Sequence, residues 1–250
     1  MNIRTKILLS TMIVSLNAPN LRVFGSELNR FKLDSIKKSF YTAYTTANLN
    51  IRKEPAVDSE ILDIIPFNSE VVISNFDDEW VKIYFLNENS PFAYVNKTYI
   101  SNDICEYTDY KISSKGFKSF MQHTSIKDKT SLQYKLQSEF AYTGDYGIRQ
   151  VNNRYCIAIG TAFGANIGTY VDLFLENGTM IPCIVADIKS DKDTFDDNIT
   201  TIHTGCVSEF VVEIDSLYSE VKRKGDISYC CEKWNSPVKT IRIYDKNILK

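Results

Sequence analysis

Apolar and polar residues alternate in short runs between residues 44 and 101, which is the pattern of β-strands with one buried face. Turn-forming residues separate these runs at intervals of roughly ten residues, and helical periodicity is scarce. This spacing predicts a small all-β barrel. The predicted strands are residues 49–52, 61–65, 70–74, 80–84 and 93–95.

A second series of apolar runs follows in residues 116–250. Val171, Leu173 and Leu175 alternate with Asp172, Phe174 and Glu176, and Asn177-Gly178 predicts a tight two-residue turn into a return strand. Short strands with glycine-bearing turns and little helix predict a second all-β domain. The predicted elements are strands 155–159, 171–175, 181–186 and 208–214, short helices near 131–138 and 217–224, and a late edge strand at 238–244.

Asp187 stands where the apolar return strand meets a polar loop, residues 189–198. A carboxyl group at such a boundary is partly desolvated, which raises its pKa and suits it to proton transfer. Asp187 is therefore the first candidate for a catalytic residue. The alternative is a solvated aspartate that begins a loop.

The N-terminus has the pattern of an export signal. Arg4 and Lys6 precede an apolar stretch, residues 7–16, that is short for a membrane span, and Gly25 offers a small-residue cleavage site. The alternative is an uncleaved membrane anchor. The predicted organisation is a signal peptide at 1–25, a linker at 26–43, a first domain at 44–101, a polar connector at 102–115 and a second domain at 116–250.

Charge and cysteine content narrow the class of protein. The sequence has 29 basic and 31 acidic residues, a net charge of −2, and residues 1–25 hold three of the basic and none of the acidic ones. The remaining chain has a net charge of −5, which argues against nucleic acid as a partner. Six cysteines in an exported chain make disulfides possible, but Cys156 and Cys183 lie in apolar strands, and we favour a partly reduced set.

The first domain carries a recognisable order of motifs. Residues 47–52 read ANLNIR, Pro55 follows, and WVKI at 80–83 precedes Tyr94-Val95. Over residues 44–101 this order resembles the bacterial SH3 domain, the SH3b module of secreted wall enzymes. The resemblance implies an SH3-like barrel that binds wall peptide or glycan. The aromatic residues expected to contact the ligand are Trp80, Tyr84 and Tyr94, with core packing as the alternative for Trp80.

The second domain carries shorter motifs between residues 155 and 214. They are Ile167-Gly168-Thr169, Gly178, Ala186-Asp187 and a glycine at 205 with Glu209 four residues later. They resemble the double-psi β-barrel of the 3D-domain, RlpA, MltA and expansin group. The resemblance implies a closed six-stranded barrel with short helices. It also implies that Asp187 acts as general acid and then as base, as in lytic transglycosylases. Glu209 would either keep the proton on Asp187 through the repulsion of like charges or simply face solvent.

Two other patterns offer chemistry. His203 lies three residues before Cys206, but a catalytic thiol needs a cation or helix terminus nearby, and the sequence shows none. We therefore expect His203 to form a hydrogen bond in the Asp187 loop, as a third candidate residue of the catalytic site beside Asp187 and Glu209, and His123 to be structural. The acidic residues of the loop lack the glycine and final glutamate of an EF-hand, so a solvated loop is favoured over calcium. No metal or other cofactor is expected.

These observations predict a secreted, cell-wall-associated bacterial protein of the Gram-positive type. It would have no stable membrane span after signal cleavage, and its partner would be peptidoglycan, through glycan or stem peptide. The favoured activity is cleavage of glycan strands in the manner of a lytic transglycosylase or glycosidase. The alternatives are a non-catalytic peptidoglycan-binding or cell-surface assembly protein, and a structural surface protein without wall affinity.

Overall fold

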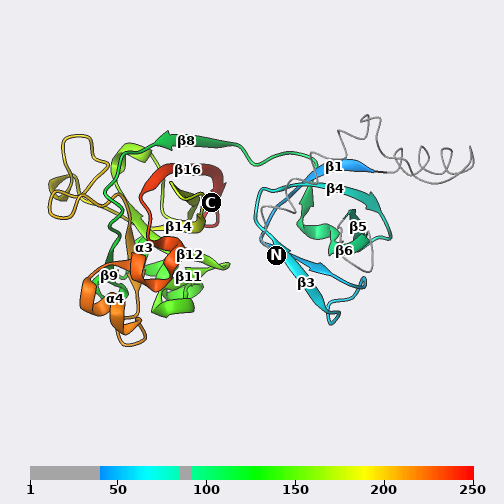
Figure 1. Cartoon of the computed structure of the whole chain (residues 1–250), viewed down its shortest axis with the longest axis horizontal. Helices are drawn as coiled ribbons and strands as arrows, with labels where there is room; N and C mark the ends of the chain where they lie inside the picture. Colours follow the sequence, from blue (N-terminus) through cyan, green and yellow to red (C-terminus); the bar gives the residue numbers. More distant parts are fainter. Residues whose placement is uncertain (1–39, 85–91) are drawn as a thin grey trace, which may run out of the picture. The chain divides into compact units, whose positions relative to one another are not determined.

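The computed structural model of the protein describes residues 40–84 and 92–250 (Figure 1). The chain divides into two compact units, Met1–Cys105 and Glu106–Lys250. Strands account for 42% of the described residues and helices for 18%, so the predicted all-β class is confirmed. The predicted signal peptide, residues 1–25, and most of the predicted linker, 26–43, lie outside the described residues.

The first unit contains one antiparallel sheet with the strand order β3-β2-β6-β5-β4-β1-β7. All five strands predicted from the alternation are present, with ends that differ by at most one residue. The strand β1 was not predicted. The elements are β1 (Tyr41–Thr45), β2 (Leu49–Arg52), β3 (Ile61–Ile65), β4 (Glu70–Asn75), β5 (Trp80–Tyr84), β6 (Phe92–Asn96), η1 (Lys97–Tyr99) and β7 (Ile100–Ser101).

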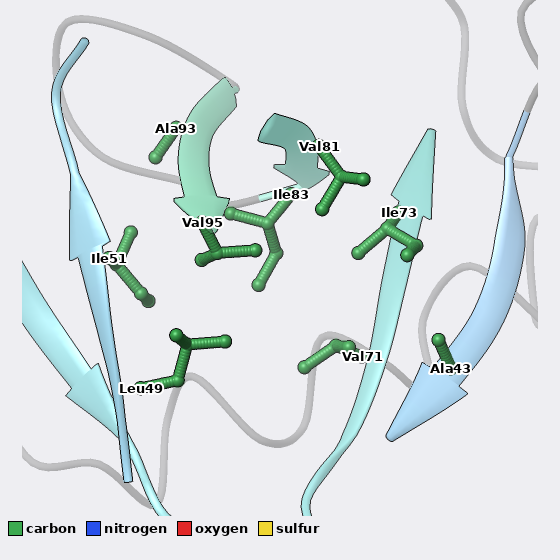
Figure 2. Close-up of a cluster of buried hydrophobic side chains, with 9 residues drawn as sticks. All are labelled: Ala43, Leu49, Ile51, Val71, Ile73, Val81, Ile83, Ala93 and Val95. Atoms are coloured by element: carbon green, nitrogen blue, oxygen red, sulfur yellow. The ribbon is translucent and has the colours of Figure 1, made fainter. Parts of the chain in front are cut away.

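The core of the first unit is built from alternate positions of five strands, whose aliphatic side chains point toward one another (Figure 2). Four of the strands contribute residues two apart, because successive side chains of a strand lie on opposite faces, and β1 contributes Ala43 alone. The same alternation that predicted the strands therefore also defines the core. Its members are Ala43, Leu49, Ile51, Val71, Ile73, Val81, Ile83, Ala93 and Val95.

Asn68 closes the turn between β3 and β4 with a φ of +58°, in the left-handed region that asparagine tolerates better than most residues. Its side-chain amide donates to the carbonyl oxygen of Cys105 (3.0 Å), and its Oδ1 accepts from the Cys105 amide (2.8 Å). Asn68 thus shapes the turn and ties it to the last residue of the first unit.

The second unit contains a mixed sheet with the order β10-β11-β12-β14-β13-β16-β8, in which β15 pairs with both β12 and β9. Two pairs are parallel, β12 with β14 and β9 with β15. The strands are β8 (Tyr107–Lys111), β9 (Ser119–Gln122), β10 (Tyr142–Thr143), β11 (Arg149–Val151), β12 (Arg154–Ile159), β13 (Thr169–Leu175), β14 (Met180–Ile188), β15 (Glu209–Val212) and β16 (Val238–Asn247).

The helical segments of the second unit are short, as predicted. The longest α-helix, α4, begins close to the predicted 217–224, and α3 with η3 occupies the region predicted at 131–138. The segments are η2 (His123–Ser125), α3 (Leu132–Lys135), η3 (Leu136–Phe140), η4 (Asp145–Gly147), η5 (Thr161–Phe163), η6 (Asp191–Asp193), α4 (Ser219–Lys224), η7 (Ile227–Cys230) and η8 (Glu232–Trp234).

Three details differ from the predictions. The turn between β13 and β14 spans residues 176–178, because the Leu175 amide donates to the Thr179 carbonyl (2.8 Å). Only Gly178 takes a positive φ there (+81°), so the prediction of a two-residue Asn-Gly turn was wrong. β16 pairs with both β13 and β8 and is therefore not an edge strand. Residues 107–111, assigned to the connector, form β8.

A buried ion pair joins the strands of the second unit. The guanidinium of Arg154 contacts the carboxylate of Asp172, and the Tyr244 hydroxyl donates to Asp172 Oδ2 (2.6 Å). Arg154 also donates to the carbonyl oxygens of Val171 and Cys183, each at 2.8 Å. Arg154 and Asp172 are 2% and 3% exposed, so each charge depends on its partners for the solvation that water would supply.

Lys118 is a second buried charge, with no exposed surface. Its Nζ donates to three carbonyl oxygens, those of Gly116 (2.8 Å), Trp234 (3.0 Å) and Ser236 (2.9 Å), and to Ser228 Oγ (3.1 Å). Burial lowers the pKa of Lys118 to about 8. Through these hydrogen bonds, the ammonium group holds the segment before β16 next to the start of β9.

Candidate functional site

Asp187 and Glu209 lie level with each other on the two sides of Ala158. Ala158 of β12 pairs with Asp187 of β14 on one side and with Glu209 of β15 on the other. Ser119 of β9 pairs in turn with Glu209, which extends the row. Paired residues on adjacent strands present their side chains to the same face, and two strand spacings amount to about 10 Å. The side chain of Ala158, which lies between the two acids, is small and buried.

A β-bulge sets this alignment. The register of β12 and β14 shifts between Ile157 and Ala158, so that Ile157 pairs with Val185 but Ala158 pairs with Asp187. Ala186 is the extra residue of the bulge. Without it, an alanine would stand level with Ala158 in place of the acid. Bulges commonly redirect a side chain next to functional sites.

Asp187 is half-buried, and this burial raises the pKa of its carboxyl group. Two hydrogen bonds oppose the shift in part: Asp187 Oδ1 accepts from the Ile188 amide (2.9 Å) and from Gln133 Nε2 (3.3 Å). The upward direction is the one expected from the position of Asp187 at a strand end. Such a group holds its proton to a higher pH than a solvated aspartate and can donate it.

Glu209 is half-buried at the start of β15, and its Oε1 accepts a hydrogen bond from the Ser119 hydroxyl (3.4 Å). Burial, and not the charge of Glu209, is the largest cause of the raised pKa of Asp187. The structure brings the two acids into one row but leaves any catalytic role of Glu209 a prediction.

Cys206 has the cationic neighbour that the sequence did not reveal. Lys189 Nζ lies 3.6 Å from Cys206 Sγ and donates to the carbonyl oxygens of Cys206 (3.0 Å) and Val207 (3.1 Å). The Ser119 and Thr201 hydroxyls contact the sulfur at 2.9 and 2.8 Å. The expectation that no cation lies nearby was therefore wrong, because the loop between β14 and β15 folds back on itself.

The Lys189 and Cys206 groups change each other's ionisation. Burial by itself raises the pKa of the Cys206 thiol, but the Lys189 ammonium and hydrogen bonds from three hydroxyl groups outweigh it, and the pKa is lowered. Burial lowers the pKa of Lys189, against the attraction of Cys206 and Glu209. The sulfur has no exposed surface, so the thiolate is stabilised but closed to a substrate.

The two histidines have different surroundings. His203 is exposed and forms no hydrogen bond with the described part of the chain, so the expected bond in the Asp187 loop is not seen there and its catalytic role stays a prediction. His123 Nε2 lies 2.6 Å from Glu213 Oε2, on the far end of β15 from Glu209. That contact lowers the pKa of Glu213 and fits a structural histidine.

The aromatic residues predicted to bind a ligand lie on the outer face of β5 and β6. Tyr84 and Tyr94 are half-buried, whereas Trp80 is 5% exposed and offers little of its ring. Two further aromatic residues join this face: Phe76 packs edge-on against Tyr94 with 5.0 Å between ring centroids, and Phe92 against Tyr84 with 5.9 Å. We call Phe76, Tyr84, Phe92 and Tyr94 the aromatic face.

Residues 47–101 match the family model of the bacterial SH3 domain. The match covers most of the described first unit, which is therefore similar to this domain and is called the SH3 domain below. Such domains are typical of cell-wall-associated or extracellular proteins and indicate a role in wall binding. No curated protein and no solved structure matches the chain. The resemblance of the second unit to the double-psi group is supported by no such match.

Within residues 40–84 and 92–250, no helix combines the length and apolarity needed to cross a bilayer. In the same part of the chain, no three histidine, cysteine or acidic side chains gather as ligands for a metal ion. Acids of the 189–206 loop instead form local bonds, as when Asp191 Oδ1 accepts from the Thr161 hydroxyl (2.6 Å).

Proposed function

We propose that this protein is secreted, that its bacterial SH3 domain holds it on peptidoglycan, and that its second unit cleaves glycan strands as a lytic-transglycosylase-like enzyme. The observation that carries the proposal is the half-buried Asp187 with its raised pKa, aligned by a bulge with Glu209 across Ala158. The SH3 domain supplies the wall as the expected substrate.

The proposed reaction needs one carboxyl group. Protonated Asp187 donates its proton to the glycosidic oxygen, and the bond between that oxygen and the anomeric carbon breaks. The resulting carboxylate then accepts the proton of a hydroxyl on the same sugar as that hydroxyl attacks the anomeric carbon, which gives an anhydro product. Proton transfer of this kind contributes roughly 10² to 10⁴ to the rate. No activated water is required, in contrast to hydrolysis by two carboxylates.

In this scheme Glu209 stabilises positive charge on the sugar ring. The transition state of glycosidic cleavage resembles an oxocarbenium ion, and a fixed carboxylate near the ring lowers its energy.

We also propose a double-psi barrel as the family of the second unit. Three features support it: the parallel pairing of β12 with β14, the parallel pairing of β9 with β15, and an acid at the end of a barrel strand. The second unit contains nine paired strands, so six of them would form the barrel and the others would be additions.

The main alternative is a binding or assembly protein whose second unit holds glycan without cleaving it. The aromatic face of the SH3 domain favours this alternative, since it supports wall binding without any chemistry.

Product analysis after incubation with purified cell walls separates the functions. The enzyme releases anhydro-muropeptides, and Asp187→Asn abolishes release while the urea unfolding midpoint is unchanged. If the protein only binds the wall, the wild type and Asp187→Asn are pulled down by cell walls to the same extent, and neither releases a soluble product. Products with reducing ends indicate hydrolysis and contradict the intramolecular route. Absence of wall affinity leaves only a structural surface role.

A further inference from the structure

The two oxygens of the Asp187 carboxyl group are not equivalent. Oδ1 accepts both hydrogen bonds, from the Ile188 amide (2.9 Å) and from Gln133 Nε2 (3.3 Å). Oδ2 accepts none from the described part of the chain. Protonation of an oxygen that already accepts two N–H donors is unfavourable. The proton would make that oxygen a hydroxyl group, which is itself a donor, beside two other donors.

We propose that Gln133 is a positioning residue: with the Ile188 amide it reserves Oδ1 as the acceptor oxygen, so that Oδ2 carries the proton that Asp187 transfers. This inference rests on the proposed function, since it names the oxygen that would deliver the proton to the glycosidic bond. The Ile188 amide is fixed by the chain itself. Gln133 is therefore the only one of the two donors that a side-chain change can remove.

The helical segment that carries Gln133 is held at both ends. At its start, the Ser131 hydroxyl accepts from the Tyr134 amide (3.1 Å) and caps α3. At its end, the Arg149 guanidinium donates to the carbonyl oxygens of Gln137 (2.9 Å) and Ala141 (2.7 Å) and to Gln137 Oε1 (3.1 Å). These bonds prevent the short helix from fraying away from Asp187.

The backbone of this segment is itself unusual. α3 continues directly into η3, which is a π-helix. π-Helical turns are rare in proteins and occur often at functional sites. Leu136 and Gln137 at the junction are buried, so the altered helical turn is part of the packed structure.

The other charged groups around Asp187 are engaged elsewhere. Glu209 lies across Ala158 and accepts from Ser119, and Lys189 directs its Nζ to Cys206 and Val207. Lys135, on the helix of Gln133, is exposed. Burial and the two amide donors are the causes of the Asp187 pKa, with no charged group among them.

Carboxyl titration by NMR of aspartate-labelled protein tests the proposal without requiring activity, with Asp187→Asn to assign the resonance. Gln133→Leu removes the donor at similar size, and Gln133→Glu replaces it with an acceptor. We expect both variants to move the Asp187 titration midpoint to higher pH, Gln133→Glu further, while Ser138→Ala on the same segment leaves it unchanged.

In Gln133→Leu, the maximal rate of product release is expected to fall by about tenfold. The alkaline limb of the pH–rate profile is expected to move to higher pH. An unchanged midpoint in both folded variants overturns the positioning role. A shifted midpoint in a protein whose wild type releases no product supports the orientation by Gln133 and contradicts the proposed function instead, so the two failures are distinguishable.

Discussion

Lys189 Nζ lies 3.6 Å from Cys206 Sγ, and both side chains are buried. The contact closes the loop that leaves β14 after Asp187 and returns to β15 before Glu209. Lys189 also donates to two carbonyl oxygens of the returning segment. One ammonium group therefore holds both ends of the loop beside the proposed site.

Lys189→Met is expected to raise the pKa of Cys206 and to lower the free energy of unfolding of the second unit. The variant takes the donor from the Val207 carbonyl oxygen, at a cost of about 1 to 3 kcal/mol, whereas the Cys206 carbonyl oxygen keeps the Thr201 amide and hydroxyl as donors. Loss of the ammonium also removes the charge that lowers the Cys206 pKa. Thiolate absorbance against pH and urea unfolding measure the two effects.

The matched control is Lys192→Met, a change in the same loop at an exposed lysine. Urea unfolding is best followed in a Trp80→Phe background, where Trp234 is the remaining tryptophan and reports on the second unit. Equal unfolding midpoints for the Lys189 and Lys192 variants would show that the contact contributes nothing to stability.

Lys118 gives a prediction about pH. Its pKa is about 8 in the folded protein and 10.5 in its ordinary state, so between these values the unfolded chain binds more protons than the folded one. Stability contributed by this group must therefore rise as the pH increases from about 8 to about 10.5, and is lost as the pH falls back through 8. Urea unfolding at several pH values measures the slope.

The comparison with variants isolates the contribution of Lys118. Lys118→Met is expected to flatten the slope and to lower stability at all pH values. The Ser236 carbonyl oxygen loses its donor, and those of Gly116 and Trp234 each lose one of two donors. Lys115→Met, at an exposed lysine three residues earlier, keeps the wild-type slope. A slope that survives in Lys118→Met must come from another group.

The SH3 domain gives a prediction about binding. Tyr94→Ala removes a ring from the aromatic face while the core positions Ala93 and Val95 on either side stay intact. We expect about tenfold weaker co-sedimentation with cell walls, the equivalent of roughly 1.4 kcal/mol, and an unchanged melting temperature.

Tyr99→Ala serves as the control for the aromatic face, because Tyr99 is an exposed tyrosine of the same domain that lies in η1. Equal loss of wall binding in both variants would move the binding surface away from the aromatic face. Trp80→Ala is less informative, since the buried ring contributes to folding.

The sequence predicted local structure well where one physical rule acted alone. In the first unit, alternation determined both the strands and the core, because each strand has one buried face. It also placed Asp187 at the end of an apolar strand, and burial raises its pKa as expected. The bulge that aligns Asp187 with Ala158 depends on pairing between distant strands, which no local pattern records.

The missed features share a cause. Lys189 looks like any lysine of a polar loop, and its role follows only from the return of the chain at Cys206. Asp172 alternates with Val171 and Leu173, and this alternation predicts that its side chain faces outward. The strand is instead buried on both faces. A polar residue within an otherwise apolar strand was the available signal for the latter.

Asp172 provides the last prediction. Asp172→Asn removes the charge that compensates the buried guanidinium of Arg154, and breaking a buried pair from one side costs about 3 to 5 kcal/mol. Tyr244→Phe removes the 2.6 Å hydrogen bond to Asp172 Oδ2, which costs about 1.5 to 3 kcal/mol. Because both changes act on one carboxylate, the double variant should lose less than the sum of the two. Urea unfolding in the Trp80→Phe background measures the three values. Additive losses would mean that Tyr244 and Arg154 stabilise the strands independently, and that Asp172 does not couple them.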